Sequence, residues 1–86
     1  MLILYTGTTC PFCRKVEAFL EDKGIEYTSK NVHQSDEYLE ELIEMGGKRQ
    51  IPYLHDTETG TAMYESSDII DYVAETYGAQ PNDIVL

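Results

Sequence analysis

An apolar strand that passes almost directly into a helix opens the chain and limits the folds available to it. Residues 2–6 form a continuous, β-prone run that ends at Gly7, and this pattern predicts a strand buried on both faces. Pro11 then begins a helix, which we expect over residues 11–23 because apolar side chains recur at helical spacing until Gly24. A strand this apolar belongs in the middle of a sheet, with the helix on one of its faces.

The segment after this helix predicts a second strand and therefore a β-α-β unit. Thr8 or Thr9 is expected to cap the helix. Residues 25–30 alternate between two sets of side chains, which is the weaker pattern of a peripheral strand. Two strands joined in this way run parallel, and the crossover between them is almost always right-handed.

A second helix and a hairpin follow. The helix is expected to begin after Ser35 and to end at the glycine pair of residues 46–47. Residues 51–56 and 61–64 predict two antiparallel strands, because a turn-like stretch separates them.

The last helix completes a single small domain. Ser66 or Ser67 is expected to begin it and Gly78 to end it. The order β-α-β-α-β-β-α then predicts an α/β fold in which a four-stranded mixed sheet is flanked by three helices. A chain of 86 residues has room for one domain, which we place at residues 1–86.

Charge and composition exclude several classes of partner. The 16 acidic and 6 basic residues give a net charge of −10, which repels nucleic acid and anionic membrane surfaces. No apolar run approaches the roughly 20 residues that cross a bilayer, and the start of the chain lacks the pattern of a signal peptide. Two cysteines are too few for a secreted disulfide framework. We therefore expect a cytoplasmic protein that binds neither nucleic acid nor membrane.

Both cysteines lie in residues 10–13, Cys-Pro-Phe-Cys, at the junction of the first strand and helix. Cys10 stands at the helix N-terminus, where free N–H groups and the helix dipole stabilise a thiolate, so it is the candidate nucleophile. Cys13 lies within the first helical turn, close enough to attack a mixed disulfide on Cys10, so it is the candidate resolving thiol. Inert buried cysteines are the alternative, but a C-x-x-C pair at such a junction favours redox chemistry.

A zinc site is a further alternative for the two cysteines. Structural zinc sites usually have four protein ligands, and only His33 and His55 could complete such a set. The two histidines are far apart in the sequence and show no paired spacing. We expect them at surface or strand positions, and we expect no bound metal.

The Ile51-Pro52 pair precedes the first strand of the predicted hairpin. A proline at this place is compatible with a cis peptide bond, which turns backbone groups toward a neighbouring site. A trans proline at the first residue of a strand is nevertheless common, and the local sequence alone favours trans.

Several segments taken together resemble the glutaredoxins of the thioredoxin-fold superfamily. They are the dithiol motif, Tyr5-Thr6 before it, Lys23-Gly24-Ile25 after the first helix, and Ile51-Pro52. The resemblance covers roughly residues 1–77. It implies a thioredoxin-like fold, a cis bond before Pro52, and strand-like pairing between the Ile51 backbone and the cysteinyl part of glutathione.

Two departures from the glutaredoxin pattern are informative. Residues 7–9 supply no lysine before the first cysteine, and the segment after the last strand has no Gly-Gly pair. That segment instead resembles the N-terminal domain of glutathione transferases, on the residues Glu65-Ser66, Ile69, Ile70 and Tyr72. This second resemblance implies that Glu65 and Ser66 hold the γ-glutamyl end of glutathione, with donors for its carboxylate and an acceptor for its ammonium group. An ordinary helix cap is the alternative.

Four of the six basic residues lie beside the two motifs in sequence: Arg14, Lys15, Lys48 and Arg49. In so acidic a chain they could attract a glutathione carboxylate and help to ionise Cys10, so docking of glutathione is expected to depend on salt. Arg14 and Lys15 are equally compatible with a solvated surface. Phe12 and Tyr5 are expected to pack, although Phe12 is also a candidate for contact with substrate.

The glutaredoxin resemblance implies a glutathione-dependent thiol–disulfide oxidoreductase that reduces protein disulfides or glutathionylated proteins. It assigns catalysis to Cys10 and Cys13, with glutathione as cosubstrate, no tightly bound cofactor and a monomeric protein. It assigns glutathione binding to Phe12, Lys48, Gln50, Ile51, Pro52, Glu65 and Ser66. Two alternatives stay open: a free-standing glutathione-binding domain like the N-terminal domain of the transferases, and a glutaredoxin that binds an iron–sulfur cluster.

Overall fold

Four strands form one mixed sheet in the order β2-β1-β3-β4 in a computed structural model, which describes residues 2–78. The strands are β1 (Leu2–Thr6), β2 (Thr28–Asn31), β3 (Tyr53–Asp56) and β4 (Thr61–Met63). β1 runs parallel to β2 and antiparallel to β3, and β3 pairs with β4 as an antiparallel hairpin. The predicted mixed four-stranded sheet and the internal position of β1 are therefore confirmed.

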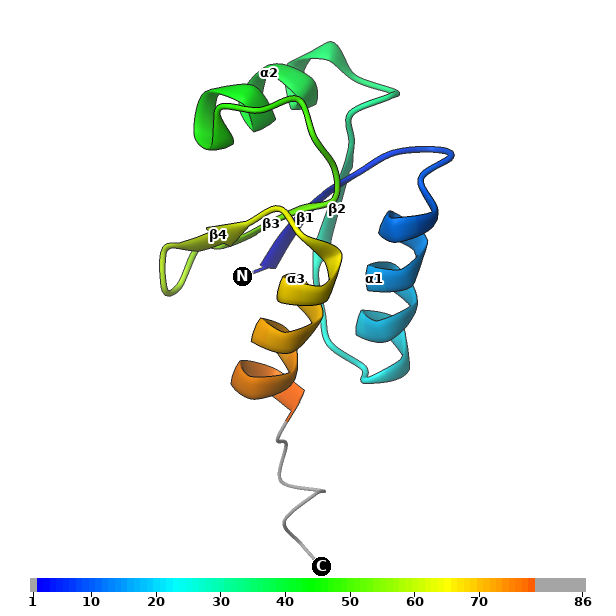
Figure 1. Ribbon diagram of the computed structural model, residues 1–86, viewed down its shortest axis with the longest axis vertical. Helices are drawn as coiled ribbons and strands as arrows, with labels where there is room; N and C mark the ends of the chain where they lie inside the picture. The colour runs from blue at the N-terminus through cyan, green and yellow to red at the C-terminus, as the bar shows by residue number, and fades with distance from the viewer. Residues whose placement is uncertain (1, 79–86) are drawn as a thin grey trace, which may run out of the picture.

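Helices cover both faces of this sheet (Figure 1). The helices α1 (Pro11–Asp22) and α3 (Ser66–Val73) lie side by side on one face, and α2 (Asp36–Gly46) lies on the other. Successive side chains of β1 point to opposite faces, so this one strand contributes to two hydrophobic clusters. The cluster on the α1/α3 face comprises Leu2, Leu4, Val16, Leu20, Leu54, Ile69 and Val73. The cluster on the α2 face comprises Tyr5, Val32, Leu42 and Tyr53.

The β1–α1 connection differs from the sequence expectation at the helix cap. Capping by Thr8 or Thr9 is wrong, because the N-cap is Cys10 in an extended conformation and both threonines are exposed. The Sγ atom of Cys10 accepts the N–H of Cys13 and so takes the role that a threonine oxygen would have. The helix ends at Asp22, one residue earlier than expected.

The second strand starts later than the alternation in residues 25–30 suggested. β2 begins at Thr28, and the residues before it belong to the connection from α1. The N–H of Ile25 donates to the carbonyl of Leu20 at 2.9 Å, and the Ile25 side chain packs against the α1/α3 cluster. The alternation therefore reflects half-burial of a loop as well as of a strand.

The second and last helices end in different ways. Gly47 follows α2 in the left-handed region at φ 80°, so the predicted stop at residues 46–47 is confirmed. The last helix is divided, because α3 ends at Val73 and a π-helical turn, η1 (Ala74–Gly78), continues to Gly78. Residues 1 and 79–86 lie outside the described part of the chain. Within residues 2–78, no helix combines the length and apolarity needed to cross a bilayer.

One buried carboxylate ties the hairpin to the last helix. Asp56 accepts hydrogen bonds from the hydroxyls of Tyr72 and Tyr77, at 2.6 and 2.7 Å, and from the N–H of Glu58 at 3.0 Å. Burial opposes the charge of Asp56, but these donors outweigh it and hold the pKa of the carboxyl below its ordinary value. This anchor holds α3 against the end of the sheet away from the cysteines.

Candidate active site

The two cysteines lie where β1 passes into α1, and the helix start organises them. Both are free thiols. The Cys13 N–H donates to the Cys10 Sγ at 3.3 Å, and the Arg14 N–H donates to the Cys10 carbonyl at 3.1 Å. The sulfur of Cys10 is thus placed at the positive end of the helix dipole, where negative charge is favoured.

The environments of the two sulfurs differ. Cys10 is half-buried, whereas Cys13 is completely buried. Burial and the hydrogen bond with Cys10 raise the pKa of the Cys13 thiol to about 11, although the contacts with Thr6 and Gly7 act in the opposite direction. Only Cys10 is accessible to an incoming disulfide. An accessible thiol beside a buried one is the arrangement expected for a nucleophile and a resolving thiol.

Gly7 allows the cysteine turn to approach the loop before β3. A Cβ atom at this position would lie 2.5 Å from Ile51 Cδ1 and 2.6 Å from His33 Cε1, which is closer than side chains pack. From the sequence, Gly7 was expected only to end the first strand, so this role was not predicted. The adjacent His33 is a surface residue, and its Nδ1 accepts the N–H of Thr8 at 3.0 Å.

The loop before β3 carries the Ile51–Pro52 peptide bond in the cis form. The local preference for trans is therefore wrong, and the cis bond implied by the glutaredoxin resemblance is found. Pro52 is buried, and Ile51 is half-buried against the α2-face cluster.

A pocket of about 250 Å³ adjoins this loop and gathers six of the seven residues assigned to glutathione. Its lining also includes Tyr64, which the sequence analysis did not single out; the full set is Phe12, Gln50, Ile51, Pro52, Tyr64, Glu65 and Ser66. Phe12 is 61% exposed, so the expectation that it packs is wrong, whereas Tyr5 is buried as expected. The pocket therefore extends from the N-terminus of α1 to that of α3.

The seventh assigned residue, Lys48, lies behind Tyr64. The Tyr64 hydroxyl accepts the N–H of Lys48 and donates to its carbonyl, both at 3.0 Å, and the Lys48 ammonium lies 5.3 Å from the centre of the Tyr64 ring. A Cβ on Gly46 would overlap with the same hydroxyl. A glycine pair ahead of the loop was the available sequence signal, because it permits an aromatic ring to pack on the backbone there.

Several polar and charged side chains in and near the pocket have partners within the protein. Gln50 Nε2 donates to Glu65 Oε2 at 3.3 Å. Arg14 pairs with Glu17 at 2.9 Å and donates to the Thr8 carbonyl at 2.7 Å, so its guanidinium group already has two partners. Arg49 lines a second pocket, of about 430 Å³, which shares only Ile51 with the first. Arg14 and Arg49 thus have different surroundings, and an attraction of glutathione by the four basic residues stays a prediction.

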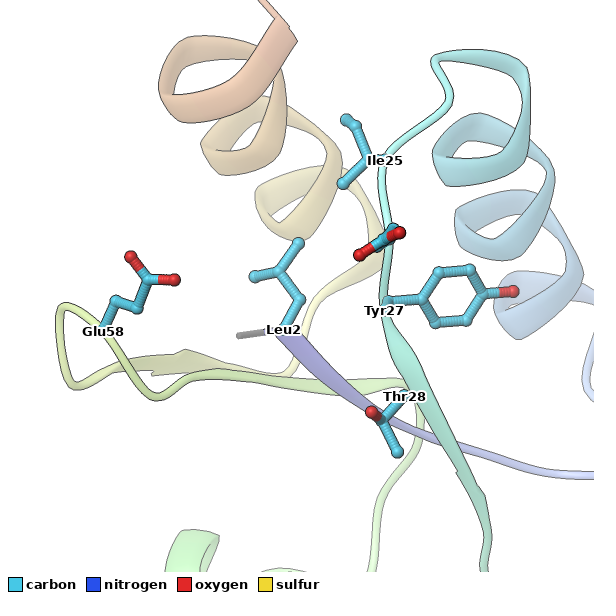
Figure 2. Close-up of a pocket in the computed structure, with 6 residues that line it drawn as sticks. Leu2, Ile25, Tyr27, Thr28 and Glu58 are labelled. Atoms are coloured by element: carbon cyan, nitrogen blue, oxygen red, sulfur yellow. The ribbon is translucent and has the colours of Figure 1, made fainter.

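A larger pocket, of about 570 Å³, lies at the far end of β1. Figure 2 shows Leu2 and Ile25 pointing toward each other there, while the Tyr27 hydroxyl is directed to α1, where it donates to Glu21 at 3.0 Å. The lining contains no cysteine and consists of Leu2, Ile25, Glu26, Tyr27, Thr28 and Glu58. Among residues 2–78, no three His, Cys, Asp or Glu side chains lie together as ligands for a metal ion.

Comparison with known proteins places this geometry among glutathione-related and thiol proteins. The family described as "Glutathione S-transferase, N-terminal domain" matches residues 4–81. Glutaredoxin 3 of Escherichia coli K12 is 29% identical over 51 residues, which are 59% of this chain and 61% of that protein. The Global transcriptional regulator Spx 2 of Bacillus anthracis is 43% identical over 42 residues, which are 49% of this chain and 32% of the regulator.

Solved structures give the same fold. A glutathione S-transferase from the Antarctic clam Laternula elliptica superposes with a TM-score of 0.77 at 30% identity, covering 93% of this chain and 36% of the transferase. The thioredoxin-like fold predicted for the chain is therefore confirmed. The chain spans about a third of the length of this transferase and of the Spx regulator. These similarities indicate a redox or glutathione-related role.

Proposed function

Because this chain belongs to the glutathione S-transferase N-terminal domain family, we propose that it is a glutathione-dependent thiol–disulfide oxidoreductase. The observation that carries the proposal is the pairing of a half-buried Cys10 with a fully buried Cys13 at the start of α1. A transferase that conjugates glutathione has no need of a second thiol behind the first. An exchange enzyme needs one thiol that meets the substrate and one that is held in reserve.

The pocket beside Pro52 offers groups for the cysteinyl and γ-glutamyl parts of glutathione. The backbone of Ile51 would pair with the cysteinyl residue as an added strand, which brings the glutathione sulfur toward Cys10. The first N–H groups of α3, with the Ser66 hydroxyl, would bind the γ-glutamyl carboxylate, and Glu65 would accept from the ammonium group. Gln50 already holds the Glu65 carboxylate in this direction.

The exchange proceeds in two steps. The Cys10 thiolate attacks the glutathione sulfur of a glutathionylated protein, and a mixed disulfide forms between Cys10 and glutathione. The cysteine of the substrate protein leaves as a thiolate. Cys13 can then attack the Cys10 sulfur, which forms the Cys10–Cys13 disulfide and releases the bound glutathione as a thiolate. Alternatively, a second glutathione attacks the sulfur of the bound glutathione, which forms glutathione disulfide and releases the Cys10 thiolate. When Cys13 resolves the intermediate, the protein ends with a Cys10–Cys13 disulfide, which external glutathione must reduce.

Single-cysteine variants test this assignment. We expect Cys10→Ser to abolish reduction of a glutathionylated peptide, because no other described thiol is exposed. Cys13→Ser should retain it, since free glutathione can resolve the intermediate, and it should lose dithiol reduction of a protein disulfide. Normal turnover by Cys10→Ser would overturn the proposal.

Glutathione conjugation is the second candidate, and the family match over residues 4–81 favours it. Chlorodinitrobenzene with glutathione measures this activity directly. Brisk conjugation with negligible disulfide reduction would reverse the order of the two candidates.

A further inference from the structure

Thr8 is the residue through which the loop before Cys10 is fastened to the rest of the molecule. The Thr8 N–H donates to His33 Nδ1 at 3.0 Å. The Thr8 hydroxyl accepts from Asn31 Nδ2 at 3.3 Å, and the Thr8 carbonyl accepts from Arg14 Nη2 at 2.7 Å. These partners come from the turn after β2, from β2 itself and from α1, so three parts of the fold fix the segment that leads into the nucleophile.

The His33 ring is itself placed for this contact. The His33 N–H donates to Asn31 Oδ1 at 2.8 Å, and the same asparagine side chain donates to the Thr8 hydroxyl. Gly7 leaves room for the ring, because a Cβ atom there would lie 2.9 Å from Nδ1 and 2.6 Å from Cε1. The hydrogen bond from Thr8 to His33 is therefore supported from both of the loops that it joins.

The three hydrogen bonds of Thr8 differ in how they respond to pH. The Asn31 amide does not titrate, and an arginine guanidinium group stays protonated in proteins. A histidine gains a proton between about pH 8 and about pH 5, and His33 is exposed, so its ring exchanges protons with water. Because Nδ1 accepts from Thr8, the neutral ring carries its proton on Nε2. The protonated ring carries a proton on both nitrogens and no longer accepts this bond.

Charged groups of both signs surround the imidazole. Asp36, in the first turn of α2, and Arg49, in the loop before β3, line the second pocket together with this ring. Arg14 reaches the Thr8 carbonyl from α1. Carboxylates and guanidinium groups in general keep their charge between about pH 5.5 and about pH 7.5. The Cys10 thiol belongs to the same loop and can also titrate, so a test must separate its ionisation from that of the histidine.

We propose that His33 is a positioning residue for Cys10, which holds Thr8 in place while the imidazole is neutral and releases it when the imidazole is protonated. The start of α1 places the Cys10 sulfur, which accepts the Cys13 N–H there. Movement of the preceding residues displaces this sulfur from the arrangement that an incoming disulfide requires. His33 acts through Thr8, and acidification slows the reaction of Cys10 by more than the loss of thiolate alone explains.

Alkylation by iodoacetamide measures the reactivity of Cys10 without glutathione. The rate is measured on the full chain at about pH 7.5 and about pH 5.5, and mass spectrometry confirms that the adduct is on Cys10. Ultraviolet absorbance gives the fraction of thiolate at each pH, so the rate constant is expressed per thiolate. Cys13 does not contribute to this absorbance, because its pKa is raised to about 11. We expect the rate constant of the unmodified sequence to fall by about 2- to 5-fold between the two pH values.

Two uncharged substitutions separate the hydrogen bond from the charge of the histidine. His33→Ala has no acceptor, so it should show the low rate constant at both pH values. His33→Asn offers Oδ1 in place of Nδ1 and does not titrate, so it should show the high rate constant at both. Hydrogen exchange of the Thr8 amide, followed by NMR, shows which variants make the bond. His55→Asn changes the other histidine of the chain, in β3, and should behave as the unmodified sequence does.

Several results would overturn the positioning role. They are a His33→Ala variant that reacts as fast as the unmodified sequence at about pH 7.5, a fall with pH that persists in either His33 variant, and a fall that is lost in His55→Asn. A slow His33→Asn variant overturns the role if its Thr8 amide is protected, and supports it if that amide exchanges as freely as in His33→Ala.

This inference rests on the proposed function only in taking Cys10 as the nucleophile. If the alkylation rates behave as expected but glutathionylated peptides are not reduced, the oxidoreductase assignment fails and the role of His33 stands. If those peptides are reduced but His33→Ala alkylates normally, the role of His33 fails and the assignment stands.

Discussion

The two faces of the sheet differ in the side chains that pack on them. The fully buried core of the α1/α3 face is aliphatic, and aromatic side chains pack only at its edge. Thr6 and Glu17 lie at the cysteine end of this face, and Asp56 lies at the opposite end. The α2 face is built on tyrosines that are hydrogen-bonded to charged groups or to backbone. The comparison suggests that the first face supplies stability and thiol chemistry, while the second shapes the binding pocket.

The tyrosine face is held by one polar cluster and one aromatic row. Glu41 accepts from the Tyr5 hydroxyl at 2.9 Å and from Lys30 Nζ at 2.8 Å, and the Lys30 ammonium lies over the rings of Tyr5 and Tyr38. The row continues from Tyr5 through Tyr53 to Tyr64, with ring centres 5.8 and 4.5 Å apart. Packing of α2 is thereby linked to the pocket wall.

The largest expected effect comes from a cavity in the aliphatic face. Leu20→Ala should lower the free energy of unfolding by about 3–5 kcal/mol, because neighbours held by two strands and two helices cannot collapse into the space. Leu42→Ala, at an equally buried residue of the α2 face, should cost about 2–3 kcal/mol. Urea unfolding followed by circular dichroism measures both. A larger loss for Leu42→Ala would contradict the proposed difference between the faces.

Asp56 should make the free energy of unfolding depend on pH, and the direction follows from its lowered pKa. Its folded-state pKa is lowered, so its contribution is present above the ordinary carboxyl pKa and is lost as pH falls through the folded value. Asp56→Asn should lower the free energy of unfolding near neutral pH by about 1–3 kcal/mol and flatten its decline below about pH 4. Urea unfolding at stepped pH tests this. An unchanged acid decline in the variant would show that other carboxylates cause it.

The smallest effect tests whether the tyrosine face shapes the pocket. Tyr64→Phe loses two hydrogen bonds to the Lys48 backbone and should weaken glutathione binding by about 3- to 10-fold, with little change in unfolding. Titration calorimetry measures the affinity. Tyr27→Phe removes a hydroxyl that binds Glu21 away from this pocket, and it should bind glutathione normally. Equal glutathione affinity in Tyr64→Phe and Tyr27→Phe would show that the Tyr64 hydroxyl does not contribute to binding.

Periodicity and local motifs predicted the order of elements because those signals are short-range. The run at residues 2–6, the start at Pro11 and the stop at residues 46–47 each depend on neighbours within a few positions. The cysteine pair was found for the same reason, since both thiols lie in one helical turn.

The features that the sequence did not reveal join residues far apart in the chain. Thr6 and Glu17 meet only because β1 and α1 pack on each other, and Tyr64 meets Lys48 across 16 positions. Capping by Cys10 was missed because sulfur is a weak acceptor and two threonines stood nearby. The Pro52 isomer needed the family resemblance, because its local sequence is compatible with both forms.

The cap of α1 has a thermodynamic consequence, because the capping atom is also the atom that changes oxidation state. Cys10 Sγ accepts the first-turn N–H of Cys13 while the thiols are reduced. If the reduced sulfur stabilises the start of the helix more than the oxidised sulfur does, then, around a closed cycle of folding and oxidation, that difference in free energy opposes oxidation of the pair by the same amount. The helix start is therefore one of the elements that sets how readily this protein gives up its electrons.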